Sequence, residues 1–340
     1  MVVNRYAEHA ERVLAGEAPS RADALAIMQS PDGDLRDLLL AAFAVREHHW
    51  GRRVKLCMLR NARSGLCQED CHYCSQSAVS EAAIDTYRLM PTADLLAGAR
   101  TAVARGARRY CMVTSGRGPS ARDIGEMSAA TRAIRAEHPE LEICVSLGIM
   151  DEAQARELKA AGVGWVNHNL NTSERFHSEI CTTHTYGERV GTIQAVKRAG
   201  LAVCCGGIIG MGEEDADVVD LAFALRELGV DSLPLNFLLA IDGTPLAKVG
   251  QGSPTRALRA LCLMRFTNPA SDIRAAGGRE RSLGSWQGLA LYPANSVFVE
   301  GYLTTAGLAT APTRQLVESM GFTVEGEVEM IDDPPPTVQA

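Results

Sequence analysis

The sequence predicts an α/β protein: a closed (β/α)8 barrel of the TIM type with an N-terminal helical extension. Two observations lead to this prediction. Eight short apolar runs recur along the chain, and amphipathic stretches with helical spacing lie between most of them. Strands that alternate with helices pair in parallel through crossovers, and eight such units fit a closed barrel. An open doubly wound sheet is the competing architecture.

The elements follow in chain order. Residues 1–50 carry helical patterns, including a stretch that Ser20 can cap and Pro31 ends. A further helix is expected to begin at Asp151, because Gln154 three residues later completes a capping-box pattern. The eight expected strands are Val54–Met58, Tyr110–Thr114, Ile143–Leu147, Trp165–Asn169, Ala202–Ile209, Leu233–Leu238, Ile273–Ala276 and Ser296–Val299.

Three segments are expected: a helical extension (residues 1–50), a barrel (51–320) and a mobile tail (321–340) whose end, IDDPPPTVQA, is rich in proline. The formal net charge is −7 and the chain has no basic block, so nucleic acid and anionic membranes are poor partners. The sequence has no apolar stretch of about 18 residues and no apolar leader near its start. We therefore expect a cytoplasmic protein that does not span a membrane.

The strongest functional signal is the run CQEDCHYC, which contains Cys67, Cys71 and Cys74. Three thiolates so close in sequence can hold three irons of a [4Fe–4S] cluster and leave the fourth iron open to a ligand. Zinc is the alternative, but a structural zinc site wants four ligands and no matching second cysteine pair exists, although His72 could contribute. Tyr73 either lies against the ligand of the open iron or packs in the core.

Cys111, Cys144 and Cys204 each fall in a different expected strand. Strands of a barrel can point such side chains into one lumen. A single buried cysteine behaves as a small hydrophobe, but three of them beside the first cysteine run favour a second cluster. Arg274, on the seventh expected strand, is the fourth candidate ligand, although arginine more commonly forms a salt bridge or binds an anion.

The run CQEDCHYC resembles the C-x3-C-x-aromatic-C signature of the radical S-adenosylmethionine (SAM) enzymes. That resemblance implies a full or partial β/α barrel, with SAM bound to the open iron and cleaved by one electron to a 5′-deoxyadenosyl radical. Longer segments resemble the biotin synthase family over roughly residues 40–320. They are SGLCQEDCHYCSQS, RYCMV, VNHNLNTS, TTHTYGERVGTI, CCGGIIGMGE, LPLNFL, DGTPLA, IRAAGGRE and ANSVFVEGYLTT.

The family resemblance implies an enzyme, a sulfurtransferase that inserts sulfur between C6 and C9 of dethiobiotin in the last step of biotin biosynthesis. It assigns Cys111, Cys144, Cys204 and Arg274 to an auxiliary [2Fe–2S] cluster that donates the sulfur. Cys205 stands where the family commonly has a small residue such as Ser, so a four-iron form stays open. We expect Cys205 to face the helix layer, because adjacent residues on a strand point to opposite sides.

The resemblance also assigns ligand contacts. The expected SAM contacts are Tyr73, Asn169, Asn171, Arg189, Ile208 and Gly210. The expected dethiobiotin contacts are Asn167, Asn236, Thr304 and Thr305. The three asparagines of VNHNLN share one side if that strand continues. Asn171 departs from the Asp common in the family, so altered SAM affinity is expected. Arg189 could instead be a surface charge. Residues 208–210 could also form a tight turn, which is compatible with SAM contact.

Flavodoxin or ferredoxin as the electron donor and a homodimer are further implications of the resemblance. One rival is a related radical SAM enzyme of hydrogenase maturation or methylornithine formation, which would lack the full set of barrel cysteines and arginine. Another is a metal-binding regulator without turnover, which would need a DNA-binding module or a basic surface. His168 is expected to pack, and Cys57, Cys181 and Cys262 are interpreted as core or surface thiols.

Overall fold

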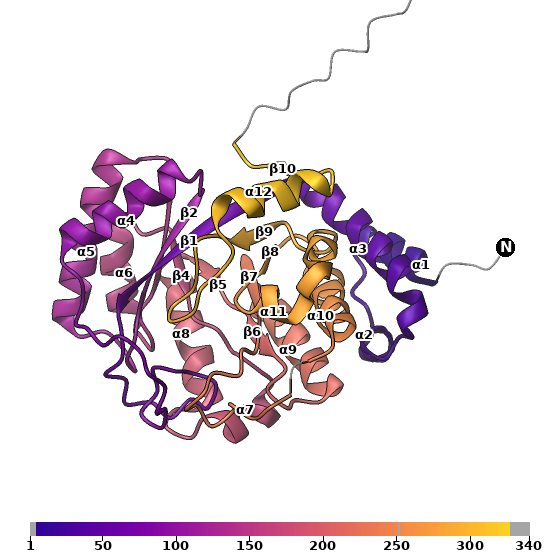
Figure 1. Cartoon of the computed structure of the whole chain (residues 1–340), viewed down its shortest axis with the longest axis horizontal. Helices are drawn as coiled ribbons and strands as arrows, with labels where there is room; N and C mark the ends of the chain where they lie inside the picture. The colour runs from indigo at the N-terminus through magenta and orange to yellow at the C-terminus, as the bar shows by residue number, and fades with distance from the viewer. Residues whose placement is uncertain (1–4, 251, 327–340) are drawn as a thin grey trace, which may run out of the picture.

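The first strand closes the sheet on itself. In the computed structural model, which describes residues 5–250 and 252–326, strand β1 (Arg53–Arg63) pairs in parallel with β2 (Arg109–Thr114) and with β9 (Ser296–Phe298). An open sheet would leave one edge of β1 without a neighbouring barrel strand, so the predicted closed barrel is confirmed (Figure 1). The other strands are β3 (Glu142–Ser146), β4 (Trp165–Asn167), β5 (Ala202–Cys204), β6 (Gly207–Ile209), β7 (Ser232–Phe237), β8 (Asp272–Ala275) and β10 (Thr323–Val324).

Helices surround the barrel (Figure 1). Before β1, the helices are α1 (Arg5–Leu14), α2 (Arg21–Met28), the 3-10 turn η1 (Asp32–Asp34) and α3 (Leu35–Trp50). After β1, they are α4 (Thr92–Ala104), α5 (Ala121–Glu137), α6 (Glu152–Ala160), α7 (Glu174–Ile180), α8 (Tyr186–Arg198), α9 (Asp215–Glu227), α10 (Pro254–Thr267), α11 (Arg279–Leu283), η2 (Gly284–Leu291) and α12 (Thr310–Ser319). The first three α-helices pack on α9 and α10, so they extend the helix layer on that side.

Local capping chemistry fixes where several helices begin. Ser20 starts α2 and Asp151 starts α6, each with a side chain that accepts from the third helical residue while that residue's side chain returns to the cap. Both N-termini agree with the sequence prediction. Such boxes satisfy backbone N–H groups that have no partner in the first helical turn.

The expected strand Ala202–Ile209 is two strands, β5 and β6. Between them the Gly206 N–H donates to Asn169 Oδ1 at 3.0 Å instead of to a neighbouring strand. A Cβ atom on Gly206 would lie 1.9 Å from the Pro234 carbonyl oxygen, so only glycine fits this close approach. The break therefore has two causes. The Asn169 side chain, which follows β4, accepts from the Gly206 N–H, and the Pro234 carbonyl crowds the same glycine.

The tail that was expected at residues 321–340 starts later in the structure, because part of this range forms a strand. Thr323 and Val324 form β10, which pairs in parallel with Arg53 and Val54 of β1, and Phe322 is buried beside it. This two-residue strand is too short to give a periodic signal in the sequence. The segment IDDPPPTVQA lies outside the described residues.

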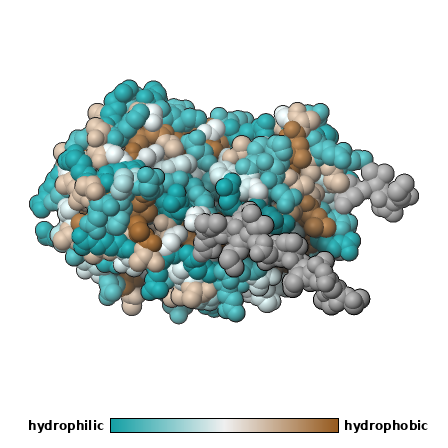
Figure 2. Space-filling view, turned by 90° about the horizontal axis from the view of Figure 1, so that it is seen from above, coloured by the Kyte–Doolittle hydropathy of each residue, from teal (hydrophilic) through white to brown (hydrophobic). Residues whose placement is uncertain are grey.

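The main apolar core lies between the strands and the helices, and a second, small group of buried residues contains Cys57, Cys111, Cys144, Ala276 and Phe298. The face in Figure 2 is mostly hydrophilic, with apolar residues in scattered groups. Within the described ranges, no helix combines the length and the apolarity that crossing a bilayer requires.

Candidate active site

A cavity of about 390 Å³ is lined by residues from the strand ends and from the long connection between β1 and α4. We call this connection, residues 64–91, the cysteine loop. The volume lies in the range of sites that enclose small organic molecules. The lining includes every predicted site residue except Gly210. Residues more than 200 positions apart in the sequence therefore meet at one site.

Gly210 belongs to a turn rather than to the cavity wall. Its φ of +99° lies in the left-handed region that favours glycine. Its N–H donates to Glu213 Oε1 at 2.9 Å, and the next N–H, of Met211, donates to Glu213 Oε2 at 2.7 Å. The structure thus places Gly210 in the tight turn that the sequence allowed, and Gly210 does not line the cavity.

The cysteine loop presents Cys67, Cys71 and Cys74 to the cavity. A turn joins two of them, because the Cys74 N–H donates to the Cys71 carbonyl at 3.1 Å. His72 is not among the lining residues, and its N–H donates to the Ile180 carbonyl at 2.9 Å. This arrangement offers three thiols without the fourth ligand that a zinc site would take from His72.

The other three predicted cysteine ligands meet inside the barrel, where Arg274 joins them; we call these four residues the auxiliary site. Cys111 and Cys144 are direct neighbours in the β2–β3 register, and the Cys144 thiol interacts with the thiols of both Cys111 and Cys204. Arg274 Nη1 lies 3.8 Å from Cys204 Sγ. Clustered thiols of this kind are the donors that iron–sulfur clusters take, so the residues fit such a cluster.

Charges around the auxiliary site favour the thiolate form of Cys204, whereas its neighbour Cys144 keeps its proton, because Cys111, Cys204 and burial raise the pKa of Cys144 well above its usual range. Arg274 Nε donates to Ser296 Oγ at 2.9 Å, and Asp272 Oδ2 lies 3.5 Å from Arg274 Nη2 and 3.4 Å from Arg109 Nη1. The hydrogen bond to Cys144, and then the nearby Arg274 and Arg109 charges, hold the pKa of Cys204 well below its usual range in spite of burial. Metal binding requires the deprotonated thiol, so this electrostatic setting suits a cluster.

The three asparagines reach the cavity from the end of β4: Asn167 is the last residue of the strand, and Asn169 and Asn171 follow it outside regular strand structure. Asn167 Nδ2 donates to Asn169 Oδ1 at 3.1 Å and lies 3.4 Å from Cys204 Sγ. Asn171 has a φ of +71°, and its Nδ2 donates to Tyr73 Oη at 2.6 Å. The expected strand to residue 169 is therefore too long, yet all three side chains line the cavity.

Arg189 is not a surface charge. It lies on α8, is buried, and donates from Nη1 to the Asn169 carbonyl at 2.8 Å. Its buried Nε has no hydrogen-bond partner among the described residues. Arg189 also lines the cavity. A buried guanidinium with an unpartnered N–H at a cavity wall is suited to binding an anionic group.

The substrate-side candidates have partners of their own. Thr304 Oγ1 and Ser75 Oγ share a hydrogen bond of 2.7 Å, which ties the loop after β9 to the cysteine loop. Asn236 Oδ1 accepts from the Gly277 N–H at 3.0 Å, and its Nδ2 donates to the Gly207 carbonyl at 3.2 Å. A side-chain amide has further hydrogen-bonding capacity, so Asn236 can still bind a ligand.

Other predicted residues take structural positions. His168 is buried, and burial, followed by the nearby Arg189 and His184 charges, lowers its pKa well below the usual range, so its ring is neutral. Cys205 and Cys262 belong to the main apolar core. Cys205 therefore adds no fourth thiol to the auxiliary site at the cavity wall, and Cys57 packs beside Cys111 and Cys144 without lining the cavity.

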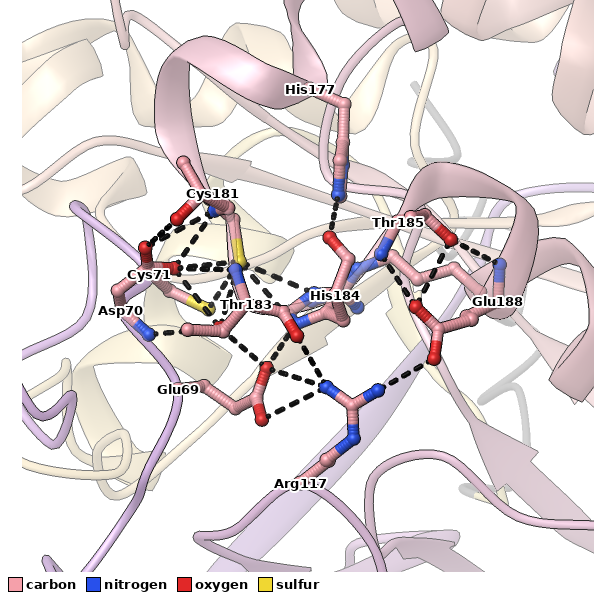
Figure 3. Close-up of polar contacts among 12 residues, drawn as sticks. Glu69, Asp70, Cys71, Arg117, His177, Cys181, Thr183, His184, Thr185 and Glu188 are labelled. Atoms are coloured by element: carbon pink, nitrogen blue, oxygen red, sulfur yellow. Dashed lines mark hydrogen bonds and ion pairs between the residues drawn. The ribbon is translucent and has the colours of Figure 1, made fainter.

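The sequence analysis missed a polar network under the cysteine loop (Figure 3). Glu69 interacts with His184, and its carboxylate lies 3.3 Å from Arg117 Nη1. Cys181, interpreted as a core or surface thiol, lies 3.8 Å from Cys71 and beside His184. The segments QED and TTHT were visible in the sequence, but only the fold shows that they meet.

Two family profiles match most of the chain. The radical SAM superfamily profile covers residues 63–225, and the Biotin and Thiamin Synthesis associated domain covers residues 234–323. The barrel, the cysteine loop and the first profile define a radical SAM enzyme.

Full-length relatives identify the family. The chain is 48% identical to the biotin synthase of Magnetococcus marinus over 93% of this chain and 98% of that protein. It is also 48% identical to the biotin synthase of Bacillus subtilis over 96% of this chain and 98% of that protein. The chain belongs to the biotin synthase family.

Solved structures support the fold alone. Methylornithine synthase superposes with a TM-score of 0.82 at 20% identity, over 93% of this chain and 97% of that one. HydG, a maturase of the [FeFe]-hydrogenase, superposes with a TM-score of 0.80 at 12% identity, over 95% of this chain and 76% of that one.

Proposed function

We propose that the cavity holds dethiobiotin between two iron–sulfur clusters and inserts sulfur between its C6 and C9 to form biotin. One observation supports this most: two separate sets of metal-binding side chains line a single cavity. The [4Fe–4S] set is Cys67, Cys71 and Cys74, and the [2Fe–2S] set is Cys111, Cys144, Cys204 and Arg274. The core position of Cys205 favours the two-iron form.

Unactivated C–H bonds offer no acidic proton, so acid–base groups of the cavity cannot open them. When bound, SAM on the [4Fe–4S] cluster supplies a radical that abstracts hydrogen, and the auxiliary cluster supplies sulfur. The protein itself positions the substrate and excludes water from the cavity. Side chains such as Phe298, Tyr302 and Leu59 line the cavity, and they limit where the substrate can move.

The SAM side of the cavity is assigned to Tyr73, Asn169, Asn171, Arg189 and Ile208. Arg189 is a buried cation at the cavity wall, which suits it to the SAM carboxylate. Asn171 and Tyr73 form one hydrogen-bonded pair, so they position each other in the part of the cavity wall that would contact SAM. The glycine at 210, expected to contact SAM, is left out because it does not line the cavity.

The dethiobiotin side is assigned to Asn167 and Asn236 for the ureido ring and to Thr304 and Thr305 for the carboxylate. Amide side chains both donate and accept, which matches the N–H and C=O groups of a ureido ring. Threonine hydroxyls donate to a carboxylate. Both threonines line the cavity from the loop after β9.

The reaction also needs electrons at low potential, and we assign them to flavodoxin or ferredoxin. We further propose a homodimer in the cytoplasm. All ten cysteines are free, which fits a reducing compartment. The net charge of −7 supports an enzyme that binds neither nucleic acid nor anionic membrane.

The test is an anaerobic assay of the reconstituted enzyme with SAM, a reductant and dethiobiotin, in which biotin and 5′-deoxyadenosine are both measured. The proposal predicts that biotin forms and that SAM cleavage depends on dethiobiotin. SAM cleavage at the same rate with and without dethiobiotin, and no biotin formed, would overturn the proposal.

A further inference from the structure

Cys181, a thiol that the proposed reaction does not use, lies directly against Cys71. Its Sγ is 3.8 Å from Cys71 Sγ, 3.6 Å from His184 Nε2 and 3.3 Å from His184 Nδ1. Ligand atoms of all three residues lie within 4.8 Å of one another, and all three residues are buried. Figure 3 shows them converging between the cysteine loop and the segment that follows α7.

The surrounding contacts hold this arrangement in place without a metal. The Asp70 carboxylate accepts from the N–H groups of Thr182 at 2.9 Å and Thr183 at 3.2 Å, which ties the segment after α7 to the cysteine loop. Glu69 Oε2 interacts with His184 Nδ1. A carboxylate on one ring nitrogen commonly orients a histidine whose other nitrogen binds a metal.

The distance between the two sulfurs matches one tetrahedral ion. Bonds of about 2.3 Å to sulfur and about 2.0 Å to nitrogen place two thiolates about 3.8 Å apart, and a thiolate and an imidazole nitrogen about 3.5 Å apart. The structure has 3.8 Å between the two sulfurs. Cys181 Sγ lies 3.3 Å from His184 Nδ1 and 3.6 Å from Nε2, so the His184 ring must turn about its χ2 bond to aim Nε2 at the ion. Two thiols this close suit a shared ion, whereas each iron of a cubane takes one cysteine.

We propose that Cys71, Cys181 and His184 form a mononuclear site for a thiophilic divalent cation such as Zn²⁺ in the cluster-free chain. Binding releases the thiol protons of Cys71 and Cys181 to solvent and transfers no electron. A water molecule takes the fourth position. Because Cys71 cannot serve both centres, the ion excludes the [4Fe–4S] cluster; this exclusion rests on the proposed role of Cys71.

The first experiment titrates the cluster-free full-length chain with Zn²⁺ against a chromogenic chelator under anaerobic conditions. We expect one tight ion per chain. Cys181→Ala and His184→Ala should each weaken binding by at least about 100-fold, more than loss of an outer-shell partner typically does. Cys262→Ala, which removes another buried thiol, should bind as the wild type does.

A Cys67→Ala/Cys74→Ala double variant separates this site from the cubane cysteines, because it keeps all three proposed ligands. It should bind Zn²⁺ as tightly as the wild type. X-ray absorption should show two sulfur ligands on the zinc. Unchanged binding by Cys181→Ala, or three sulfur ligands, would place the ion on Cys67, Cys71 and Cys74 and overturn the proposal.

A separate experiment measures whether bound zinc prevents assembly of the [4Fe–4S] cluster. Zinc-loaded wild type should gain the visible absorbance of an iron–sulfur cluster more slowly than Cys181→Ala treated with the same zinc. Without zinc, the two chains should gain it equally. Equal rates with zinc present would contradict exclusion. A Cys181→Ala chain that fails to assemble the cluster without zinc would show that Cys181 serves the cluster instead.

Discussion

Arg274 Nη1 lies 3.8 Å from Cys204 Sγ inside the closed barrel. The arginine is fully buried, and Ser296 and Asp272 hold its other nitrogens. Burial lowers the pKa of Arg274, but the nearby Cys57 and Asp272 charges raise it well above its usual range, so it stays charged. A charge kept among thiols is expected where a negatively charged cluster is to be held.

Removing Cys144 should separate the two halves of the reaction. Cys144 touches both other thiols of the auxiliary site, whereas it does not belong to the cysteine loop. We expect Cys144→Ala to cleave SAM, measured as 5′-deoxyadenosine, while biotin formation is lost. Cys262→Ala, which removes a buried thiol of the main core, should retain both activities. Equal loss of both activities in Cys144→Ala would contradict the sulfur-donor role.

Arg189→Gln should weaken the binding of SAM and leave the binding of dethiobiotin unchanged. The change removes a charged donor, and hydrogen bonds to charged groups contribute about 1.5–3 kcal/mol, so the KM for SAM should rise roughly 10- to 100-fold. The matched variant is Thr304→Val, which should instead raise the KM for dethiobiotin roughly 2- to 10-fold. If the two variants affect the opposite ligands, the assigned orientation of the cavity is wrong.

Asp272→Asn should destabilise the chain. This carboxylate is buried between Arg109 and Arg274, and its loss leaves the buried Arg274 without a carboxylate partner and Arg109 with Glu142 alone. Breaking such a group typically lowers the free energy of unfolding by about 3–5 kcal/mol. Urea denaturation of the cluster-free wild type and variant measures this difference in the free energy of unfolding.

The control for that change is Asp220→Asn, which breaks an exposed ion pair with Arg21. Exposed pairs contribute below about 1 kcal/mol. Similar losses in the two variants would show that Asp272 does not neutralise the auxiliary site.

Asp217 should make stability depend on acid pH. Burial raises its pKa, but hydrogen bonds from Arg175 at 2.9 Å and Ser173 at 2.6 Å outweigh burial and lower it. A lowered folded-state pKa stabilises the fold above the unfolded value of about 3.9, and the contribution is lost as pH falls through the folded value. Wild type should therefore lose more unfolding free energy than Asp217→Asn between about pH 5 and about pH 3. Parallel losses in the two chains would contradict this.

Much of the fold could be predicted because barrel strands and their helices carry local periodic signals. Asp151 shows this well, since its capping box is complete within four residues. The split between β5 and β6 could not be predicted, because it depends on Asn169 and Pro234 approaching Gly206 from elsewhere in the chain. For β10, two residues are too few to show a period.

Some features of the candidate site could likewise be predicted from local sequence, and others could not. The cysteine run could be predicted because its spacing is local, and the barrel cysteines because each lies in a recognisable strand. The contact between Cys71 and Cys181 spans 110 positions, and no spacing rule predicts it. Arg189 was ambiguous for the same reason, since only the fold shows that its helix turns this charge inward.

The most direct test of two separate clusters in one cavity is Mössbauer spectroscopy with iron and sulfide counting on the anaerobically reconstituted chain. The account predicts about six irons per wild-type chain, as one four-iron and one two-iron cluster. It predicts that Cys144→Ala keeps only the four-iron signal. About four irons in wild type, unchanged by Cys144→Ala, would contradict it.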